Sequence, residues 1–301
     1  MIFLIEQREY PYDELVSYLQ SLSQKYNFFK LTQEGVTAVG RPIYSVRIGV
    51  DTNNVFYAGG FHGSERLTTL VLVMFLEQLC DALVNNLNFS LTNARTALYG
   101  KSILCVPCVN PDGYEISRGG VETAGVYADS VRTILGNNES KFWNANAKGI
   151  DINHNFNAGF DLLKELEIAQ GITGPSPRRY GGQTPESEIE TQVVTRLCRN
   201  NFCNKVLALH SQGEEIYWQF GENTPQDSFR LAQLFSTASG YKIASPSGTA
   251  SYGGFKDWFI QDFGRPGFTL EIGKGENPLP PSDLYAIYDK LYELFLLSFA
   301  L

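Results

Sequence analysis

Short runs of apolar residues alternate along this chain with longer stretches in which apolar residues recur every three or four positions. A short run that is apolar throughout indicates a strand covered on both faces, and the longer spacing indicates an amphipathic helix. Strand-like runs occupy residues 43–50, 55–58, 103–106, 206–209, 216–220 and 267–270. Helices are expected over residues 11–26, from 64 to about 79, from 184 onward, and over 282–299. This alternation predicts an α/β fold with three layers in the order α/β/α.

Nothing in the sequence of 301 residues marks a boundary between domains, because it contains no long Pro/Ser/Gly linker and no low-complexity tract. We therefore expect one domain over residues 1–301. Residues 110–113 predict a turn, and residues 117–182, rich in glycine and asparagine, are expected to be mostly irregular. Long irregular segments in compact domains usually carry function.

Charge and hydropathy exclude some classes of partner. The formal net charge of −8 argues against nucleic acid, since proteins that bind it need a basic surface to displace phosphate counterions. No uninterrupted apolar run approaches the roughly 18–20 residues of a membrane span, and residues 70–76 are expected to form one buried helix face. The first residues are too short an apolar stretch for a secretory signal and lack its basic start. We therefore expect a cytoplasmic protein without a membrane span.

The cysteines agree with that location. Their odd number, five, predicts reduced thiols. Cys105 and Cys108 have the spacing of a redox motif but lie in an apolar strand pattern. A buried structural pair is therefore favoured over a reactive one.

The chain has only three histidines, and two of them are placed for metal binding. His62 follows an apolar run and has Glu65 three residues further on, while His210 ends another apolar run. Two imidazoles and a carboxylate, with a fourth position left for water, are what a catalytic zinc site needs. Glu271 ends a further run, and strand ends are where sites cluster in such sheets.

Six segments in this order resemble the zinc carboxypeptidase superfamily. They are residues 61–65, 109–114, 149–156, 209–211, 253–258 and 268–271, and they span nearly the whole chain. The resemblance implies a mixed, mostly parallel, twisted central sheet and one Zn²⁺ per chain, bound by His62, Glu65 and His210. It also implies that Glu271 is the catalytic carboxylate. A glutamate beside a zinc-activated water can take its proton and deliver it to the leaving amine.

The residues that would hold the substrate depart from the family pattern. Carboxypeptidases hold a free C-terminal carboxylate with an Asn-Arg pair, at positions that match Asn153 and His154. A histidine offers one donor and is largely neutral at pH 7, whereas arginine is a permanent two-donor fork. Packing is the alternative role for His154. The family's cleft tyrosine corresponds to Thr249, although Tyr252 is close enough in sequence to replace it.

Two further positions concern cations. The family's carbonyl-polarising arginine corresponds to Asn144, with Lys148 and Arg118 as possible replacements. Lys256 corresponds to the floor of the pocket for the leaving residue, where a lysine suggests an acidic group on that residue. A solvated surface lysine is the alternative.

These departures resemble the bacterial γ-D-glutamyl-L-diamino acid endopeptidases, which cut peptidoglycan stem peptides before a diamino acid such as meso-diaminopimelate. Residues 175–182 also resemble this branch, with their arginines either at the site or on the surface. The predicted partner is therefore a muropeptide or a short peptide. Two alternatives stay open: a metallocarboxypeptidase that removes acidic C-terminal residues, and an inactive muropeptide-binding module.

Overall fold

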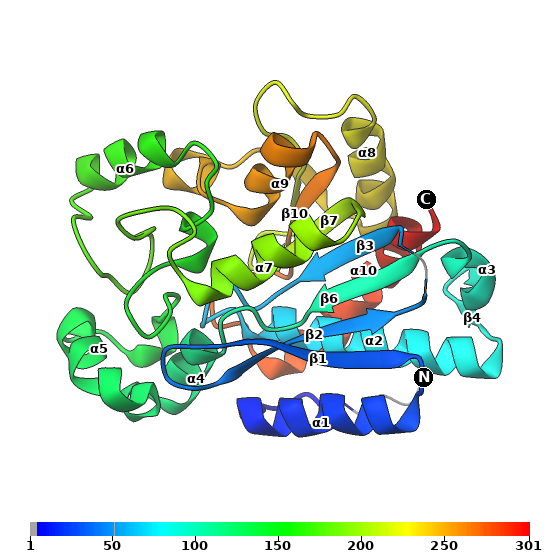
Figure 1. Cartoon of the computed structure of the whole chain (residues 1–301), viewed down its shortest axis with the longest axis horizontal. Coiled ribbons are helices and arrows are strands. Elements are labelled where there is room, and N and C mark those ends of the chain that lie inside the picture. Colours follow the sequence, from blue (N-terminus) through cyan, green and yellow to red (C-terminus); the bar gives the residue numbers. More distant parts are fainter. Residues whose placement is uncertain (1–4, 51) are drawn as a thin grey trace.

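The computed structural model describes residues 5–50 and 52–301, so the expectation about the first residues of the chain falls partly outside the described residues. Within these residues the centre of the molecule is an eight-stranded sheet, in the order β1–β2–β6–β3–β7–β10–β8–β9 (Figure 1). The strands are β1 (Phe29–Val36), β2 (Pro42–Ile48), β3 (Asn54–Ala58), β6 (Ser102–Val106), β7 (Cys203–His210), β8 (Glu215–Tyr217), β9 (Lys242–Ala244) and β10 (Gly267–Glu271). The neighbours β6, β3, β7 and β10 are parallel, whereas β1–β2, β2–β6 and β8–β10 pair antiparallel. The prediction of a mixed, mostly parallel sheet is confirmed.

The two faces of the sheet pack against different helices. Along β3, Val55 and Tyr57 join one buried cluster, while Phe56 and Ala58 join another on the opposite face. The first cluster is completed by α1 (Tyr12–Lys25), α2 (Arg66–Asn85), α8 (Asp227–Ser239) and α10 (Leu284–Ala300), and the second by α7 (Ile189–Asn200) and α9 (Phe255–Phe263). Side chains alternate across a strand, so a strand apolar throughout must be covered on both faces. The three layers follow from that requirement.

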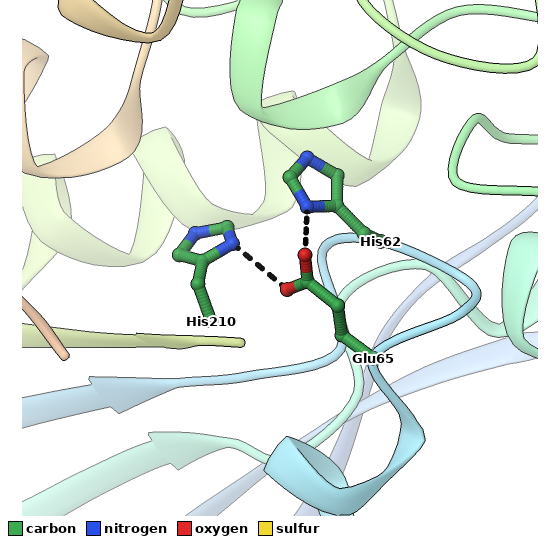
Figure 2. A group of neighbouring side chains, drawn as sticks. All are labelled: His62, Glu65 and His210. Atoms are coloured by element: carbon green, nitrogen blue, oxygen red, sulfur yellow. Dashed lines mark hydrogen bonds and ion pairs between the residues drawn. The ribbon is translucent and has the colours of Figure 1, made fainter. Parts of the chain in front are cut away.

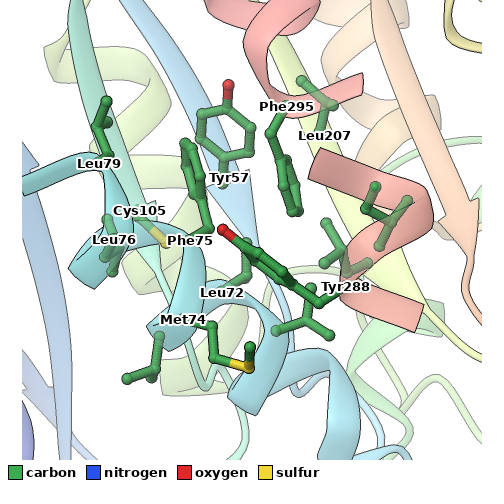
Figure 3. Packing of buried hydrophobic residues seen from close by; sticks show 14 of the residues in the cluster. Tyr57, Leu72, Met74, Phe75, Leu76, Leu79, Cys105, Leu207, Tyr288 and Phe295 are labelled. Atoms are coloured by element: carbon green, nitrogen blue, oxygen red, sulfur yellow. The ribbon is translucent and has the colours of Figure 1, made fainter. Parts of the chain in front are cut away.

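Aromatic side chains pack together with leucine and methionine side chains between β3, α2 and α10 (Figure 3). The Phe75 ring centroid lies 5.0 Å from that of Tyr57 and 4.6 Å from that of Phe295. Complete burial of a side chain such as Phe75 contributes about 1.5–3 kcal/mol of transfer free energy. Helix α2 is long and apolar enough to cross a membrane by length and composition, but 78% of its most apolar window is buried inside the protein. It is a core helix, as residues 70–76 predicted.

The remaining elements lie around this sandwich. They are α3 (Ala94–Leu98), α4 (Pro111–Gly119), α5 (Ala128–Leu135), α6 (Phe160–Ala169), the hairpin β4 (Asn88–Phe89) and β5 (Thr92–Asn93), and the 3-10 helices η1 (Val121–Tyr127), η2 (Ser140–Phe142), η3 (Ile152–His154), η4 (Gly248–Ser251) and η5 (Pro281–Asp283). All five cysteines are buried and free.

Three expectations about these elements were wrong. Residues 110–113 begin helix α4 and do not form a separate turn: Asn110 caps the helix by accepting a hydrogen bond from the Gly113 N–H, and Pro111 occupies the first turn. Much of the segment 117–182 is helical. Helix α7 begins at Ile189 and not near residue 184, because the intervening loop is held by the Asn155 amide, which donates to the carbonyls of Gly181 and Thr184.

Candidate active site

Three strands that are distant in sequence bring the chemically active side chains to one edge of the sheet. His210 is the last residue of β7 and Glu271 the last of β10, and the two are paired in the parallel register. Strand β3 lies on the other side of β7 and ends at Ala58, four residues before His62. The expectation that the candidate residues lie at carboxyl ends of strands is confirmed.

The turn that carries His62 is packed backbone against backbone. A Cβ atom on Gly63 would lie 2.1 Å from the carbonyl oxygen of Gly113 and 2.6 Å from that of Trp143, so only glycine fits there. The Asn110 side chain fixes the same turn by donating a hydrogen bond of 3.0 Å to the Phe61 carbonyl. The cap of α4 therefore also positions the residue before His62.

His62, Glu65 and His210 converge on one point (Figure 2). Their ligand atoms all lie within 4.8 Å of one another, with Nδ1 of His62 2.7 Å and Nδ1 of His210 3.1 Å from the two carboxylate oxygens of Glu65. On its far side, His62 donates its Nε2–H to Asp151 Oδ1 at 2.9 Å, so Nδ1 is the ring nitrogen that would bind a metal. Two imidazole nitrogens and a carboxylate fit Zn²⁺ with three protein ligands.

Charge at this edge also favours a cation. Burial alone would lower the pKa of His62, but the carboxylates of Glu65 and Asp151 outweigh it and raise that pKa well above 6.5. Burial opposes ionisation of Glu65, yet the two histidines lower its pKa to about 2. Burial and the nearby Glu65 charge raise the pKa of Glu271. The ionised carboxylates of Glu65 and Asp151 therefore create a negative field beside the imidazoles, which a divalent ion would compensate.

Residues 15–293 match the zinc carboxypeptidase family. The chain belongs to this family. The peptidase is therefore a zinc-dependent hydrolase, and its group of two histidines and a glutamate is placed to bind that zinc.

The proteins similar to the peptidase include an endopeptidase and several carboxypeptidases. It is 34% identical over 292 residues to γ-D-glutamyl-L-diamino acid endopeptidase 1 of Lysinibacillus sphaericus, covering 96% of this chain and 72% of that one. Among solved structures, the carboxypeptidase A of Helicoverpa armigera has a TM-score of 0.71 at 18% identity, covering 98% of this chain and 74% of that one. The murein-tripeptide amidase MpaA of Escherichia coli O157 has a TM-score of 0.54 at 19% identity, covering 88% and 91%. These structural likenesses bear on the fold alone.

Asp151 has a position in the site of the peptidase that sequence reasoning missed. Besides His62, it accepts a hydrogen bond from the Arg179 N–H at 2.7 Å, and the charge of His62 helps to hold its pKa far below the usual value despite burial. Its only signal in the sequence was its place in the segment 149–156. Nothing local there distinguishes a residue that orients a histidine from one that caps the 3-10 helix, and Asp151 does both.

Asn153 and His154, the pair predicted to hold a substrate carboxylate, are both engaged within the protein. Asn153 Oδ1 accepts a hydrogen bond of 3.0 Å from the Phe255 N–H at the start of α9. His154 is buried, and its Nδ1 donates to the carbonyl oxygen of Arg179 at 2.9 Å. Roles in substrate binding stay predictions for both, with His154 also serving the packing role named as its alternative.

Each cation predicted for the substrate site already has a carboxylate partner. The pairs are Arg118 with Glu115 at 2.7 Å, Lys148 with Glu188 at 3.1 Å, and Lys256 with Asp257. Lys256 also donates to the Gln219 carbonyl at 2.8 Å and is 3% exposed, so the alternative of a solvated surface lysine is wrong. The role of Lys256 in the substrate pocket stays a prediction. Its positive charge is compensated by Asp257.

The other predicted substrate residues lie in two turns. Asn144 follows the buried Trp143, and its side-chain oxygen accepts a hydrogen bond of 2.5 Å from the Ser64 hydroxyl, next to Glu65. Thr249 is buried in η4. Tyr252 follows that turn and is partly exposed, with its ring against Gly159.

Proposed function

We propose that this zinc metallopeptidase hydrolyses peptidoglycan stem peptides between γ-D-glutamate and a diamino acid such as meso-diaminopimelate. The relative from Lysinibacillus sphaericus, 34% identical over 96% of the chain, carries the name of that activity. The observation that carries the proposal is the state of His154, which stands where a carboxypeptidase has its carboxylate-binding arginine.

His154 is ill suited to bind the free carboxylate of a peptide terminus. Its Nδ1 is occupied by the Arg179 carbonyl, and the ring is buried. One remaining imidazole nitrogen cannot reproduce the two parallel donors of a guanidinium. Without a contact to the terminal carboxylate at position 154, the enzyme does not require a substrate that ends one residue after the scissile bond.

The chemistry of bond cleavage follows from the residues at the strand ends. His62, Glu65 and His210 would hold the zinc, and the bound ion would supply the Lewis acidity that activates a water and polarises the scissile carbonyl. In its carboxylate form, Glu271 would accept the proton of the attacking water and deliver it to the leaving amine. This role is supported by the register of β10 on β7, which pairs Glu271 with His210.

Two substrates test the proposal. The zinc-loaded protein is incubated with L-Ala-γ-D-Glu-meso-diaminopimelate and, separately, with a hippuryl dipeptide that ends in an acidic residue. We expect release of meso-diaminopimelate from the first and little cleavage of the second. Cleavage of the hippuryl dipeptide alone would establish the acidic metallocarboxypeptidase and overturn the cell-wall proposal.

The inactive muropeptide-binding module is separated by metal content and turnover. It predicts binding of the tripeptide without release of diaminopimelate, and no effect of a chelator.

The cytoplasmic location is a further part of the proposal, with trimming or recycling of soluble muropeptides as the corresponding role.

A further inference from the structure

A loop that carries two arginines is fastened to the metal-site edge through its backbone. We define residues 175–182 as the arginine loop. Its Arg179 donates its N–H to Asp151 Oδ2 and accepts from His154 Nδ1 at its carbonyl, and its Tyr180 carbonyl accepts from the Asp151 N–H at 2.7 Å. A Cβ atom on Gly181 would lie 2.3 Å from the His154 carbonyl, so the loop lies in direct backbone contact with this segment.

A single carboxylate separates the backbone of Arg179 from a metal ligand. One oxygen of Asp151 holds the His62 ring at 2.9 Å and the other holds the Arg179 N–H at 2.7 Å. Asp151 is 2% exposed, so these bonds form away from competing water and fix the two groups relative to each other. The position of Arg179 is thus set by the same group that sets the zinc ligand.

The side chains of Arg178 and Arg179 are exposed, and neither guanidinium has a hydrogen bond or ion pair within residues 5–50 and 52–301. This distinguishes them from the cations first considered for the substrate site. Arg118, Lys148 and Lys256 are each neutralised by a carboxylate. The two guanidinium groups of the arginine loop are therefore available to bind an anionic ligand.

The backbone of Arg179 is also held in an unfavourable conformation. Its φ is +70°, in the left-handed region that disfavours any residue with a Cβ atom. Glycine would occupy this position without strain, yet the chain has a long cationic side chain there. Strained residues of this kind are enriched at active sites and ligand-binding segments.

We propose that Arg179 binds the free α-carboxylate of the γ-linked D-glutamyl residue of the substrate. The inference rests on the proposed function, because only a γ-linkage leaves that carboxylate free beside the scissile bond. A guanidinium is suited to it, since its fork donates two parallel hydrogen bonds to a carboxylate. The cation absent at position 154 is thus replaced by one that recognises the acyl side of the cut.

Three substrates and three variants test this assignment. The substrates are L-Ala-γ-D-Glu-meso-diaminopimelate, its analogue with the D-glutamyl α-carboxylate amidated, and its analogue with L-lysine as the leaving residue. The variants are Arg179→Gly, Arg179→Lys and, as a matched neighbour, Arg178→Ala. Arg179→Gly relieves the backbone strain, so zinc content and Tm should be kept while the side chain is lost.

For the wild-type protein and Arg178→Ala we expect amidation to reduce kcat/KM by about 10- to 100-fold, the range for a hydrogen bond to a charged group. For Arg179→Gly the two substrates should differ by less than about threefold, since the partner of the carboxylate is gone. Arg179→Lys should retain part of the discrimination through its point charge.

Several results would overturn the assignment. One is equal discrimination in Arg179→Gly and wild type, and another is the same loss in Arg178→Ala. A third is loss of discrimination only against the lysine analogue, which would place the contact on the leaving residue. In each of these the wild-type enzyme still cleaves the tripeptide and the proposed function stands. Failure of the wild-type enzyme to cleave any γ-D-glutamyl substrate would overturn both.

Discussion

Glu190 is a buried carboxyl group at the start of α7, and neither of its oxygens hydrogen-bonds to another residue in the described part of the chain. Burial raises its pKa to about 8 and the charges of Asp112 and Glu188 add to this, while a contact with its own backbone N–H and the charge of Lys148 oppose the rise. A folded-state pKa above the unfolded value of about 4.5 means that the folded protein binds the extra proton. This contribution to stability is complete below pH 4.5 and is lost as the pH rises through 8.

Glu190→Gln should therefore flatten the pH dependence of unfolding. We expect wild type and variant to be similar near pH 5, and the variant to be more stable than wild type by a few kcal/mol near pH 9, where the buried carboxylate would be charged. Urea unfolding at a series of pH values measures the difference, with the exposed Glu165→Gln as a control. If the free energies of unfolding of Glu190→Gln and wild type depended on pH in the same way, ionisation of Glu190 would not destabilise the folded protein.

Glu271→Gln separates metal binding from catalysis. The amide keeps the size of the side chain but cannot accept a proton, so kcat should fall by at least about 10²-fold, the lower range for a general base. Zinc content should stay near that of wild type, because the ligands His62, Glu65 and His210 are unchanged. Turnover near the wild-type rate would remove Glu271 from the mechanism.

Asp151→Asn tests how the zinc ligand is oriented. The amide can still contact His62 but no longer supplies the charge that holds the Nε2–H, so zinc affinity should fall by about 10- to 100-fold. Competition with a chromogenic chelator measures this. Asp161→Asn, on the exposed first turn of α6, should leave the affinity unchanged.

At the level of the elements, the turn between β3 and α2 is the most sensitive connection. Gly63→Ala places a methyl group against two carbonyl oxygens, and overpacking of this kind costs about 1–3 kcal/mol. We expect lower stability and weaker zinc binding together, by thermal unfolding and metal titration. Gly174→Ala is the matched control, since a Cβ atom there meets nothing within 4 Å. Equal effects of the two substitutions would contradict the close approach at Gly63.

The elements that could be predicted from sequence are those whose signal is local. The run 55–58 became β3 and the periodic segment after Glu65 became α2, because uniform burial and helical spacing are visible in a few consecutive residues. Strand β1 was not predicted, since one of its faces is open and its sequence mixes Phe29 and Leu31 with polar residues. The residues 110–113 contain the same Asn-Pro pattern that begins turns and helices alike.

The site residues, too, divide into those with a local signal in the sequence and those without one. His62, Glu65 and His210 lie within or beside strand ends, so their grouping could be expected once a parallel sheet was predicted. The contacts of Asp151 and Arg179 depend on how residues 117–182 cross the edge of the sheet, which no short pattern encodes. The buried ion pair of Lys256 with Asp257 could not be predicted from sequence either. Whether a helix residue is buried depends on the layer against which the helix packs.

For the whole molecule, zinc should act as a stabilising link between distant parts of the chain. A ligand that binds only the folded state stabilises it by about 4 kcal/mol at a thousandfold excess over its Kd. Removal of zinc with a chelator should therefore lower Tm by several degrees and abolish turnover, and added zinc should restore both. Calorimetry of the stripped and reloaded protein provides the measurement. An unchanged Tm after verified removal of the metal would contradict this link.

The position of β7 between β3 and β10 sets an order of events during folding. Residues 62 and 210 come together only when the parallel pairing of β3 with β7 has closed a loop of well over a hundred residues, and such non-local contacts form slowly. The first two ligands alone, at positions 62 and 65, are too few to hold zinc firmly before that closure. Metal uptake during refolding should therefore follow the assembly of the central sheet. The time at which zinc binds would then report when β3 and β7 have paired.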